Sequence, residues 1–374
     1  MTSRLYPTTR FLYIQITTVL QGLGMATVTS PTQFELLCLY VTGLVLLDRR
    51  QNNKRISRWL PGRCHDALNR LLRTMPLSSR VLMRLILTYA RRLGVKGYLC
   101  VDDVVVPKPF SRMVRWVDWV YCATEKRSLR GMNIVVILWC WQGLKLPVAF
   151  RLWQSKRQVD ASDYRTKHQL AQEMVIELLA ERLPFEYLTF DSWYNARWFT
   201  KWLSNCDILW VTTAKCNTKV VYRHQTQRLD KLSNHLKWRW RKSLDLRTAL
   251  VSIWLPGYGS LRLVVTKNGR GKCEYIVTNA WHLDVTRIVL LKRSRWNIET
   301  LFRNGKQLAG LAACECRRPQ AVVRHVALVL ITCTVLDLMG IDWSKTADSV
   351  KEQLQLRVIS QGSLPPAPLQ ARAM

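Results

Sequence analysis

Segments typical of strands and of helices alternate between residues 97 and 214, and their order limits the folds open to this chain. The first, GYLCVDDVVV, is a short β-branched run that ends at Pro107, as buried strands often do. Two apolar runs around a Gln-Gly pair predict a β-hairpin over 133–153. The segments that follow are a helix from about Ser162 to Pro184, a strand over 186–191, a helix over 195–204 and a strand over 208–214. This order predicts a mixed α/β sheet with flanking helices.

The remaining regions differ from this core in their patterning. Residues 1–95 have apolar positions at helical spacing, and we expect an all-helical region that binds DNA. Residues 216–290 contain strand-type runs and predict a β-rich insertion between two parts of the core, 96–215 and 291–344. The tail, 345–374, ends in SLPPAPLQARAM, which predicts disorder.

The charge of the chain indicates its partner. There are 57 Lys and Arg against 25 Asp and Glu, a formal net charge of +32, which attracts polyanions at ordinary salt. Nucleic acid is favoured over a membrane because the cations are spread along the chain rather than gathered in one block. The apolar run at 34–47 is shorter than the roughly 20 residues of a spanning helix and predicts a buried helix. We therefore expect a cytoplasmic protein without a membrane part.

Cysteine and histidine do not form a recognisable metal motif. The eleven cysteines include no CxxC pair, and the nearest approach is Cys314-Glu-Cys316. We expect reduced thiols and no metal site built on His or Cys.

Two basic segments suit DNA, and each has an ordinary alternative. Residues 54–73 fit a helix-turn-helix that turns Arg63, Arg70 and Arg73 toward phosphates, and fit equally a helical hairpin with a solvated basic face. The run KWRWRK at 237–242 interleaves Trp with cations, as base stacking and phosphate contact require. An edge strand with alternating faces gives the same pattern.

Three carboxylates are the most informative acids in so basic a chain. Asp102 and Asp103 lie inside an apolar strand, and Asp191 closes the later strand YLTFD. A carboxylate in such a place is costly unless it is paired or binds a metal. If the two strands are neighbours, the acids converge and favour magnesium, which prefers oxygen ligands. Glu299 from a helix is a candidate third ligand of a two-metal site.

The segment RSRWNIETLFRNGKQLAGL, 293–311, places Arg295, Glu299 and Lys306 close to one face of a helix. An acid flanked by two cations suits a metal ion beside a DNA phosphate. By spacing alone, a solvated ladder of ion pairs through Arg303 explains the pattern as well.

Several motifs, in order, resemble one family. VDDVVVPKP with TEKRSLRGMNIVVIL, then LTFDSWY, then RWNIETLFRNGKQLAGL and RHVALVLITC are similar to the DDE transposases of bacterial insertion sequences, in the IS-four-like branch. The resemblance covers roughly residues 97–340. It implies an RNase H-like core with a β-rich insertion before the Glu. The family signature, Tyr, two residues, Arg, three residues, Glu, six residues, Lys, fits at Arg295, Glu299 and Lys306, with Lys292 in place of Tyr.

The resemblance implies a mechanism and a set of site residues. Asp102, Asp191 and Glu299 would be the catalytic acids and hold two Mg²⁺ ions, with Mn²⁺ as an alternative; Asp103 is the fallback for Asp102. The expected reaction is hydrolysis at the transposon ends, followed by attack of the 3′-hydroxyl on target DNA. The residues expected to contact phosphate or DNA are Arg295, Lys306, Lys126, Arg127, Arg130 and Trp193.

The partner is then double-stranded DNA, both transposon ends and target, and a homodimer is expected because two ends must be paired. One rival interpretation is a metal-dependent nuclease without strand transfer. Another is a non-catalytic DNA-binding protein derived from a transposase. The loop cations fit a solvated loop as well as DNA contact, and core packing is a competing role for Trp193.

Overall fold

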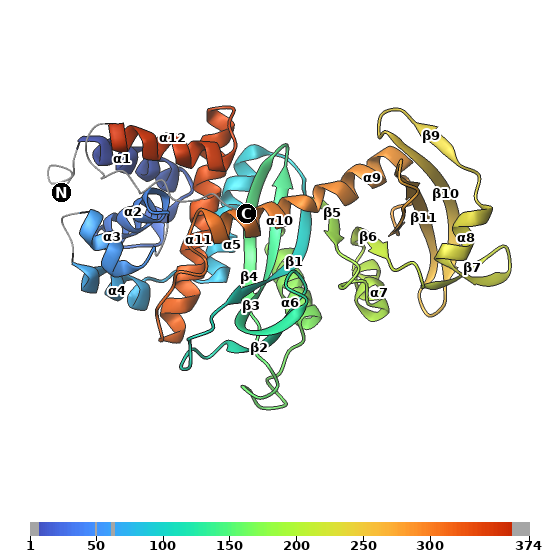
Figure 1. The fold of residues 1–374 in the computed structure, drawn as a ribbon, viewed down its shortest axis with the longest axis horizontal. Helices are drawn as coiled ribbons and strands as arrows, with labels where there is room; N and C mark the ends of the chain where they lie inside the picture. Colours follow the sequence, from blue (N-terminus) through green and yellow to red (C-terminus); the bar gives the residue numbers. More distant parts are fainter. Residues whose placement is uncertain (1–6, 49–50, 61–63, 361–374) are drawn as a thin grey trace.

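The protein is built from a helical part, a central sheet and a β-rich part, which lie side by side in that order (Figure 1). This computed structural model describes residues 7–48, 51–60 and 64–360. In the described chain the strands join into one twelve-stranded sheet, which runs from the central part into the β-rich part.

The central sheet has the strand order β4-β3-β1-β5-β6. Strands β1, β5 and β6 are parallel, whereas β3 is antiparallel to both β1 and β4. Their bounds are β1 Gly97–Pro107, β3 Arg127–Trp141, β4 Leu144–Leu152, β5 Phe185–Phe190 and β6 Leu209–Ala214. The predicted RNase H-like mixed sheet is confirmed. A further strand, β2 (Val117–Cys122), pairs with the start of β3 and was not predicted.

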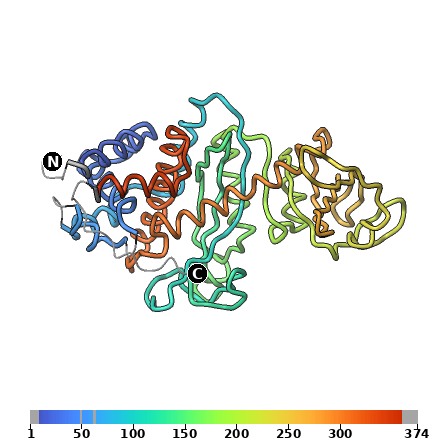
Figure 2. Tube along the Cα trace, turned by 45° about the horizontal axis from the view of Figure 1, so that its top comes forward, coloured from blue at the N-terminus to red at the C-terminus, as the bar shows by residue number. Residues whose placement is uncertain are grey.

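The helices of this part differ from the prediction at two places. Helix α6 (Lys167–Ala180) begins five residues later than the predicted start at Ser162, because Thr166 and Gln169 form a capping box. The segment predicted as one helix over 293–311 is divided: α9 (Val285–Ser294) ends before Arg295, and α10 (Trp296–Gln307) follows it. In both ribbon and tube, α9 and α10 run from the β-rich part across the central sheet (Figure 2). The other helices are α7 Arg197–Asn205 and α11 Pro319–Asp342.

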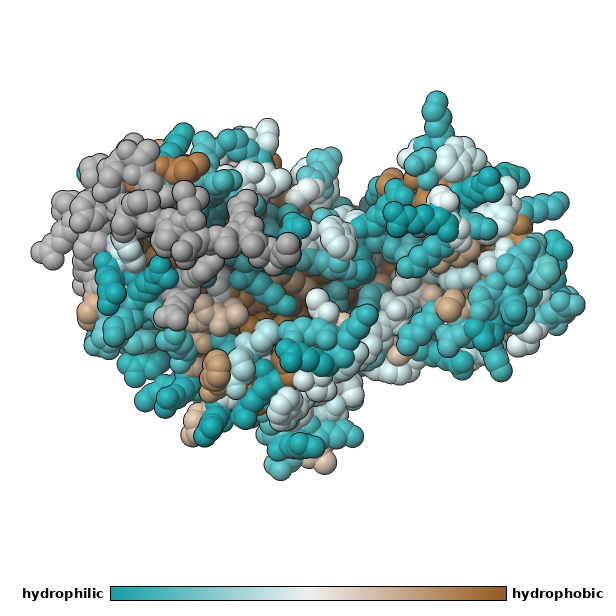
Figure 3. Space-filling model, viewed as in Figure 1, coloured by the Kyte–Doolittle hydropathy of each residue, from teal (hydrophilic) through white to brown (hydrophobic). Residues whose placement is uncertain are grey.

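The β-rich part continues the central sheet because β12 pairs antiparallel with β6. Its elements are β7 Lys219–Tyr222, β8 Gln225–Arg228, α8 Leu229–Leu232, η3 Ser233–His235, β9 Arg239–Arg241, β10 Leu246–Leu255, β11 Gly259–Lys267 and β12 Cys273–Thr278. Helix α9 packs on β11 and β12 with Ile288 and Val289 buried. Hydrophilic side chains cover most of the face of this part that is visible in Figure 3.

The first 95 residues are helical throughout their described elements. These are α1 Pro7–Gly22, η2 Met25–Thr27, α2 Pro31–Leu46, α3 Asn53–Trp59, α4 His65–Thr74 and α5 Ser79–Leu93. Helix α2 is buried from Leu36 to Leu46, which confirms the predicted buried helix. In the suggested helix-turn-helix, α3 and α4 are the two helices, and Arg63 lies outside the described residues. Only α11, among the described helices, is long and apolar enough to cross a membrane, and 83% of its apolar window is buried inside the protein.

The prediction of a disordered tail from residue 345 was wrong for its first part. Residues Ala347–Ser360 form helix α12, which packs on α11, α2 and α1. Val350, Leu354 and Val358 are buried at a spacing of four, which is one face of a helix. Residues 361–374 lie outside the described part of the chain.

A buried lysine fastens α12 to the end of α10. Nζ of Lys351 donates to the carbonyl oxygens of Leu47 at 2.9 Å and Leu308 at 2.7 Å. The amide of Gln51 donates to the same two oxygens, at 2.7 and 2.9 Å. Burial lowers the pKa of Lys351 to about 8, so that below this pH the fold contains a buried cation at a cost in stability.

We expect the free energy of unfolding of the natural chain to depend on pH through Lys351, and the Lys351→Met variant to lose this dependence. Between about pH 8 and 10.5 the unfolded chain keeps the proton that folded Lys351 has lost, so stability gains with rising pH there. Relative to the variant, the natural chain should gain roughly 2–3 kcal/mol across this window. Both carbonyls keep Gln51 as a donor in the variant. Urea unfolding at several pH values, with exposed Lys345→Met as control, measures the difference, and parallel curves would contradict it.

Candidate active site

Asp102 and Asp191 occupy equivalent positions of two neighbouring parallel strands, β1 and β5. Val101 of β1 pairs with Phe190, the last residue of β5, so the next residue on each strand is an aspartate. Side chains alternate along a strand, and partners in register share a face. Burial, then the negative charges of Asp191 and Asp103, raise the pKa of Asp102 to about 7.

Asp103 points to the opposite face and is fully engaged there. Its Oδ2 accepts hydrogen bonds from Nζ of Lys167 at 2.7 Å and Nδ2 of Asn133 at 2.8 Å. Its Oδ1 accepts one from the hydroxyl of Tyr194 at 3.2 Å. These contacts give Asp103 the pattern of a structural carboxylate.

Arg295 joins the first and third acids. Its Nη1 donates to Oδ2 of Asp102 at 3.1 Å, and its Nη2 donates to Oε1 of Glu299. Burial alone would lower the pKa of Arg295, but the charges of Asp102, Glu299 and Asp191 raise it above its ordinary value. Asp102 and Glu299 therefore share one guanidinium group, and the charge of Asp191 also acts on it.

The donor atoms of this cluster suit a hard divalent cation, because all three acids offer carboxylate oxygens. Burial, with the charges of Asp191 and Asp103, raises the pKa of Asp102, and a bound cation would counteract this rise. No three metal-ligating side chains lie close enough together to hold a metal ion in the part of the chain that is described. Arg295 stands between two of the candidate ligands. Carboxylate oxygens are ligands that Mg²⁺ and Mn²⁺ accept, and Arg295 binds two of them here.

Two other predicted residues lie near the cluster. Trp193 lies two residues after Asp191, and its backbone N–H donates to Oδ1 of that acid at 2.8 Å. Its ring is 48% exposed, stacks on His168 at 4.5 Å between centroids and lies 4.9 Å from Nζ of Lys167. Lys306 is exposed on α10, seven residues beyond Glu299 and hence about 10 Å further along the helix.

The structure does not bring the loop cations to the carboxylates. Lys126 lies in the turn between β2 and β3, Arg127 pairs with Glu125, and Arg130 lies on β3. Asp102 pairs with Val136, which is six residues or roughly 20 Å along the strand from Arg130. They lie too far away to touch the same phosphate as Arg295.

Lys292, where the resembled family has Tyr, pairs with Glu274 of β12. It thus joins the end of α9 to the β-rich part, and not to the acids.

The fold agrees with a comparison to protein families. A family model described as DDE superfamily endonuclease matches residues 21–247, more than half of the 374 residues. The chain belongs to the DDE superfamily endonucleases. The match confirms the predicted resemblance at the level of the superfamily, whose members are nucleases that act on DNA and generally use divalent metal ions. No curated protein matches the chain.

The matched range of this DDE endonuclease contains Asp102 and Asp191, and it ends before Glu299. The case for Glu299 therefore rests on its place beside Arg295. The sequence reasoning did not find Asn133, Lys167 and Tyr194, which hold Asp103. The sequence could have indicated Lys167 only through the capping box of Thr166 and Gln169, which places Lys167 in the first turn of α6.

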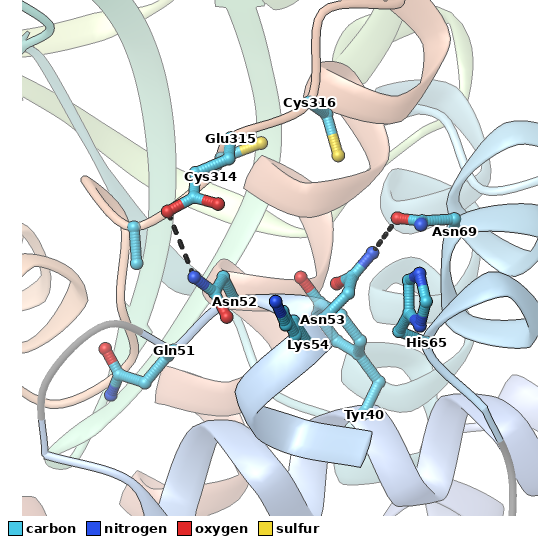
Figure 4. Close-up of a pocket in the computed structure, with 11 residues that line it drawn as sticks. Tyr40, Gln51, Asn52, Asn53, Lys54, His65, Asn69, Cys314, Glu315 and Cys316 are labelled. Carbon is cyan, nitrogen blue, oxygen red and sulfur yellow. Dashed lines mark hydrogen bonds between the residues drawn. The ribbon is translucent and has the colours of Figure 1, made fainter. Parts of the chain in front are cut away.

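A separate pocket of this DDE endonuclease lies away from the acids, between α3, α4 and the segment 313–316 (Figure 4). Asn52 donates to Glu315 at 3.0 Å across it, and Asn53 donates to Asn69 at 2.5 Å. Cys314 and Cys316 line it as free thiols. This pocket lies between the N-terminal helices and the segment that precedes α11, and holds none of the predicted site residues.

Proposed function

We propose that this DDE endonuclease is the transposase of a bacterial insertion sequence, cutting DNA at the transposon ends and joining the 3′-hydroxyl ends to target DNA. The observation that carries the proposal is that Asp102 and Glu299 bind the same guanidinium, and that Asp102 lies on the strand next to the one that ends before Asp191. The charge of +32 and the Arg295, Glu299, Lys306 spacing support it further.

In this proposal each residue has a task that its position allows. Asp102, Asp191 and Glu299 would hold two Mg²⁺ ions, which supply activation of the attacking hydroxyl and stabilisation of the leaving oxygen. Arg295 and Lys306 bind phosphates beside the scissile bond. Exposed Trp193 offers a face on which an unpaired base can stack next to Asp191.

The remaining parts would handle the ends of the element. The N-terminal helices bind the terminal inverted repeats, and the strand β9, with Trp240 exposed between Arg239 and Arg241, is a second DNA surface. A homodimer pairs two ends in one complex. A cytoplasmic, nucleoid-associated protein fits this work.

The test is the kind of product formed. Duplexes with the sequences that flank the coding region are mixed with the full chain, a supercoiled plasmid and Mg²⁺. A transposase gives end duplexes covalently joined to plasmid, and Glu299→Gln gives neither cut nor joined DNA while still binding the duplex. Glu173→Gln, a half-buried glutamate of α6 that pairs with Arg165, is the matched control and should behave as the natural chain.

The rival functions give different products. Cut ends without joining would show a nuclease, and DNA binding without cleavage in the natural chain would show a non-catalytic protein. Unchanged cleavage by Glu299→Gln would overturn the site.

A further inference from the structure

We propose that Arg295 is an internal counter-ion that blocks the metal site until a DNA phosphate draws it away, so that DNA and metal bind cooperatively. The inference rests on the proposed function of the acids and adds a regulation of that same site. It concerns what keeps the metals out before DNA arrives.

Arg295 binds the carboxylate oxygens that a metal ion held by these acids would bind. One guanidinium nitrogen bonds Asp102 and the other bonds Glu299, and the charge of Asp191 acts on the same side chain. An ordinary pair on a helix surface would join Arg295 only to Glu299, four residues on. The additional bond crosses from α10 to β1, 193 residues away in sequence. A divalent ion bound by these acids would need the oxygens that Arg295 now holds.

The position of Arg295 lets it leave. It lies at the break between α9 and α10 and its side chain is 20% exposed. The next residue, Trp296, is 61% exposed, so the surroundings are open to a large ligand on that side. A guanidinium binds phosphate with the same two-pronged geometry with which it binds carboxylate. A phosphate brought to this edge would therefore compete with Asp102 and Glu299 for Arg295.

The exchange of partners links two binding events. When phosphate holds Arg295, the three acids lose their counter-ion and their mutual repulsion favours a divalent cation. Linkage is reciprocal, so a metal that displaces Arg295 also raises the affinity for DNA. The device would keep the nuclease from holding metals, and so from cutting, until DNA lies in the site.

The experiment measures metal binding rather than cleavage. Free Mn²⁺ is followed by electron paramagnetic resonance as it is titrated into the full chain, with and without a 20-base-pair duplex, and the Mn²⁺ bound by the duplex alone is subtracted. For the natural chain we expect DNA to tighten Mn²⁺ binding about tenfold or more. For Arg295→Gln we expect Mn²⁺ without DNA to bind about tenfold tighter than in the natural chain, and DNA to change this by less than threefold.

Two controls separate this device from a general effect of charge. Arg303→Gln removes one exposed positive charge from the same helix and should leave the coupling intact. Arg295→Lys keeps the charge but has a single ammonium in place of the fork, and should bind Mn²⁺ with intermediate affinity. If circular dichroism shows that Arg295→Gln does not fold, Arg295→Lys replaces it in the Mn²⁺ titration.

The outcomes distinguish this inference from the proposed function. Equal coupling by DNA in the natural chain and in the Arg295 variants would overturn the counter-ion role and leave the metal site standing. Mn²⁺ binding that is unaffected by Asp191→Asn and by Glu299→Gln would overturn the metal site itself, and with it both proposals.

Discussion

Replacing Asp102 by Asn is expected to reduce DNA cleavage at least about a thousandfold, which is a loss of about 4 kcal/mol of transition-state stabilisation. The amide keeps the shape of the side chain and removes the charge that a metal requires. Asp102 shares its face with Asp191 and reaches Glu299 through Arg295. Initial rates on plasmid DNA in Mg²⁺ measure the loss, and a gel-shift assay shows whether DNA binding is kept.

The matched control is the neighbouring acid. Asp103→Asn keeps an oxygen for Lys167 and Asn133, and the amide nitrogen can donate to Tyr194. We expect cleavage to fall less than tenfold, and stability to fall by about 2 kcal/mol because Lys167 loses its charged partner. The reverse result, an active Asp102 variant and an inactive Asp103 variant, would move the site to the other face of β1.

Trp139→Ala is expected to lower the free energy of unfolding by about 4 kcal/mol. Trp139 is fully buried on β3, and its indole nitrogen donates to the carbonyl oxygen of Pro184 at 2.7 Å. The ring also fills the space over Gly97, at the start of β1. It thus packs β3 against the beginnings of the two strands that carry Asp102 and Asp191.

Urea unfolding followed by circular dichroism measures this loss. Trp119→Ala on β2 is the control, because its side chain is 63% exposed in the same sheet; we expect a change below about 1 kcal/mol. A loss of similar size in both variants would show that the buried tryptophan has no special place in the sheet.

Much of the core could be predicted because its signals are local. The β-branched run of β1, the hairpin of β3 and β4 and the short strand β5 are each readable within about ten residues. Strand β2 was missed because VDWVYC alternates buried and exposed residues without a long apolar run. Helix α12 was missed because its buried positions gain their meaning only from the helices they pack on, as the anchoring of Lys351 illustrates.

The acids of the candidate site were proposed from sequence, whereas their hydrogen-bond partners could not be. Asp102 and Asp191 stand out as charges beside apolar strands, a signal each carries by itself. Because neighbours on a strand point to opposite faces, only one of Asp102 and Asp103 can share a face with Asp191. Which one it is depends on long-range contacts, those of Arg295 with Asp102 and of Lys167 with Asp103. The pairing of Lys292 with Glu274 depends on the fold of the β-rich part, which no local pattern specifies.

Arg295 separates two consecutive helices, α9 and α10, which pack on different parts of the protein. Helix α9 is packed into the β-rich part through Ile288 and Val289 and tied to it by Lys292, while α10 carries Glu299 over β1. Lys292 and Arg295, close together in the chain, therefore bind Glu274 of the β-rich part and Asp102 of β1 respectively. The β-rich part is thus connected to the candidate site through the short stretch of main chain from Lys292 to Arg295.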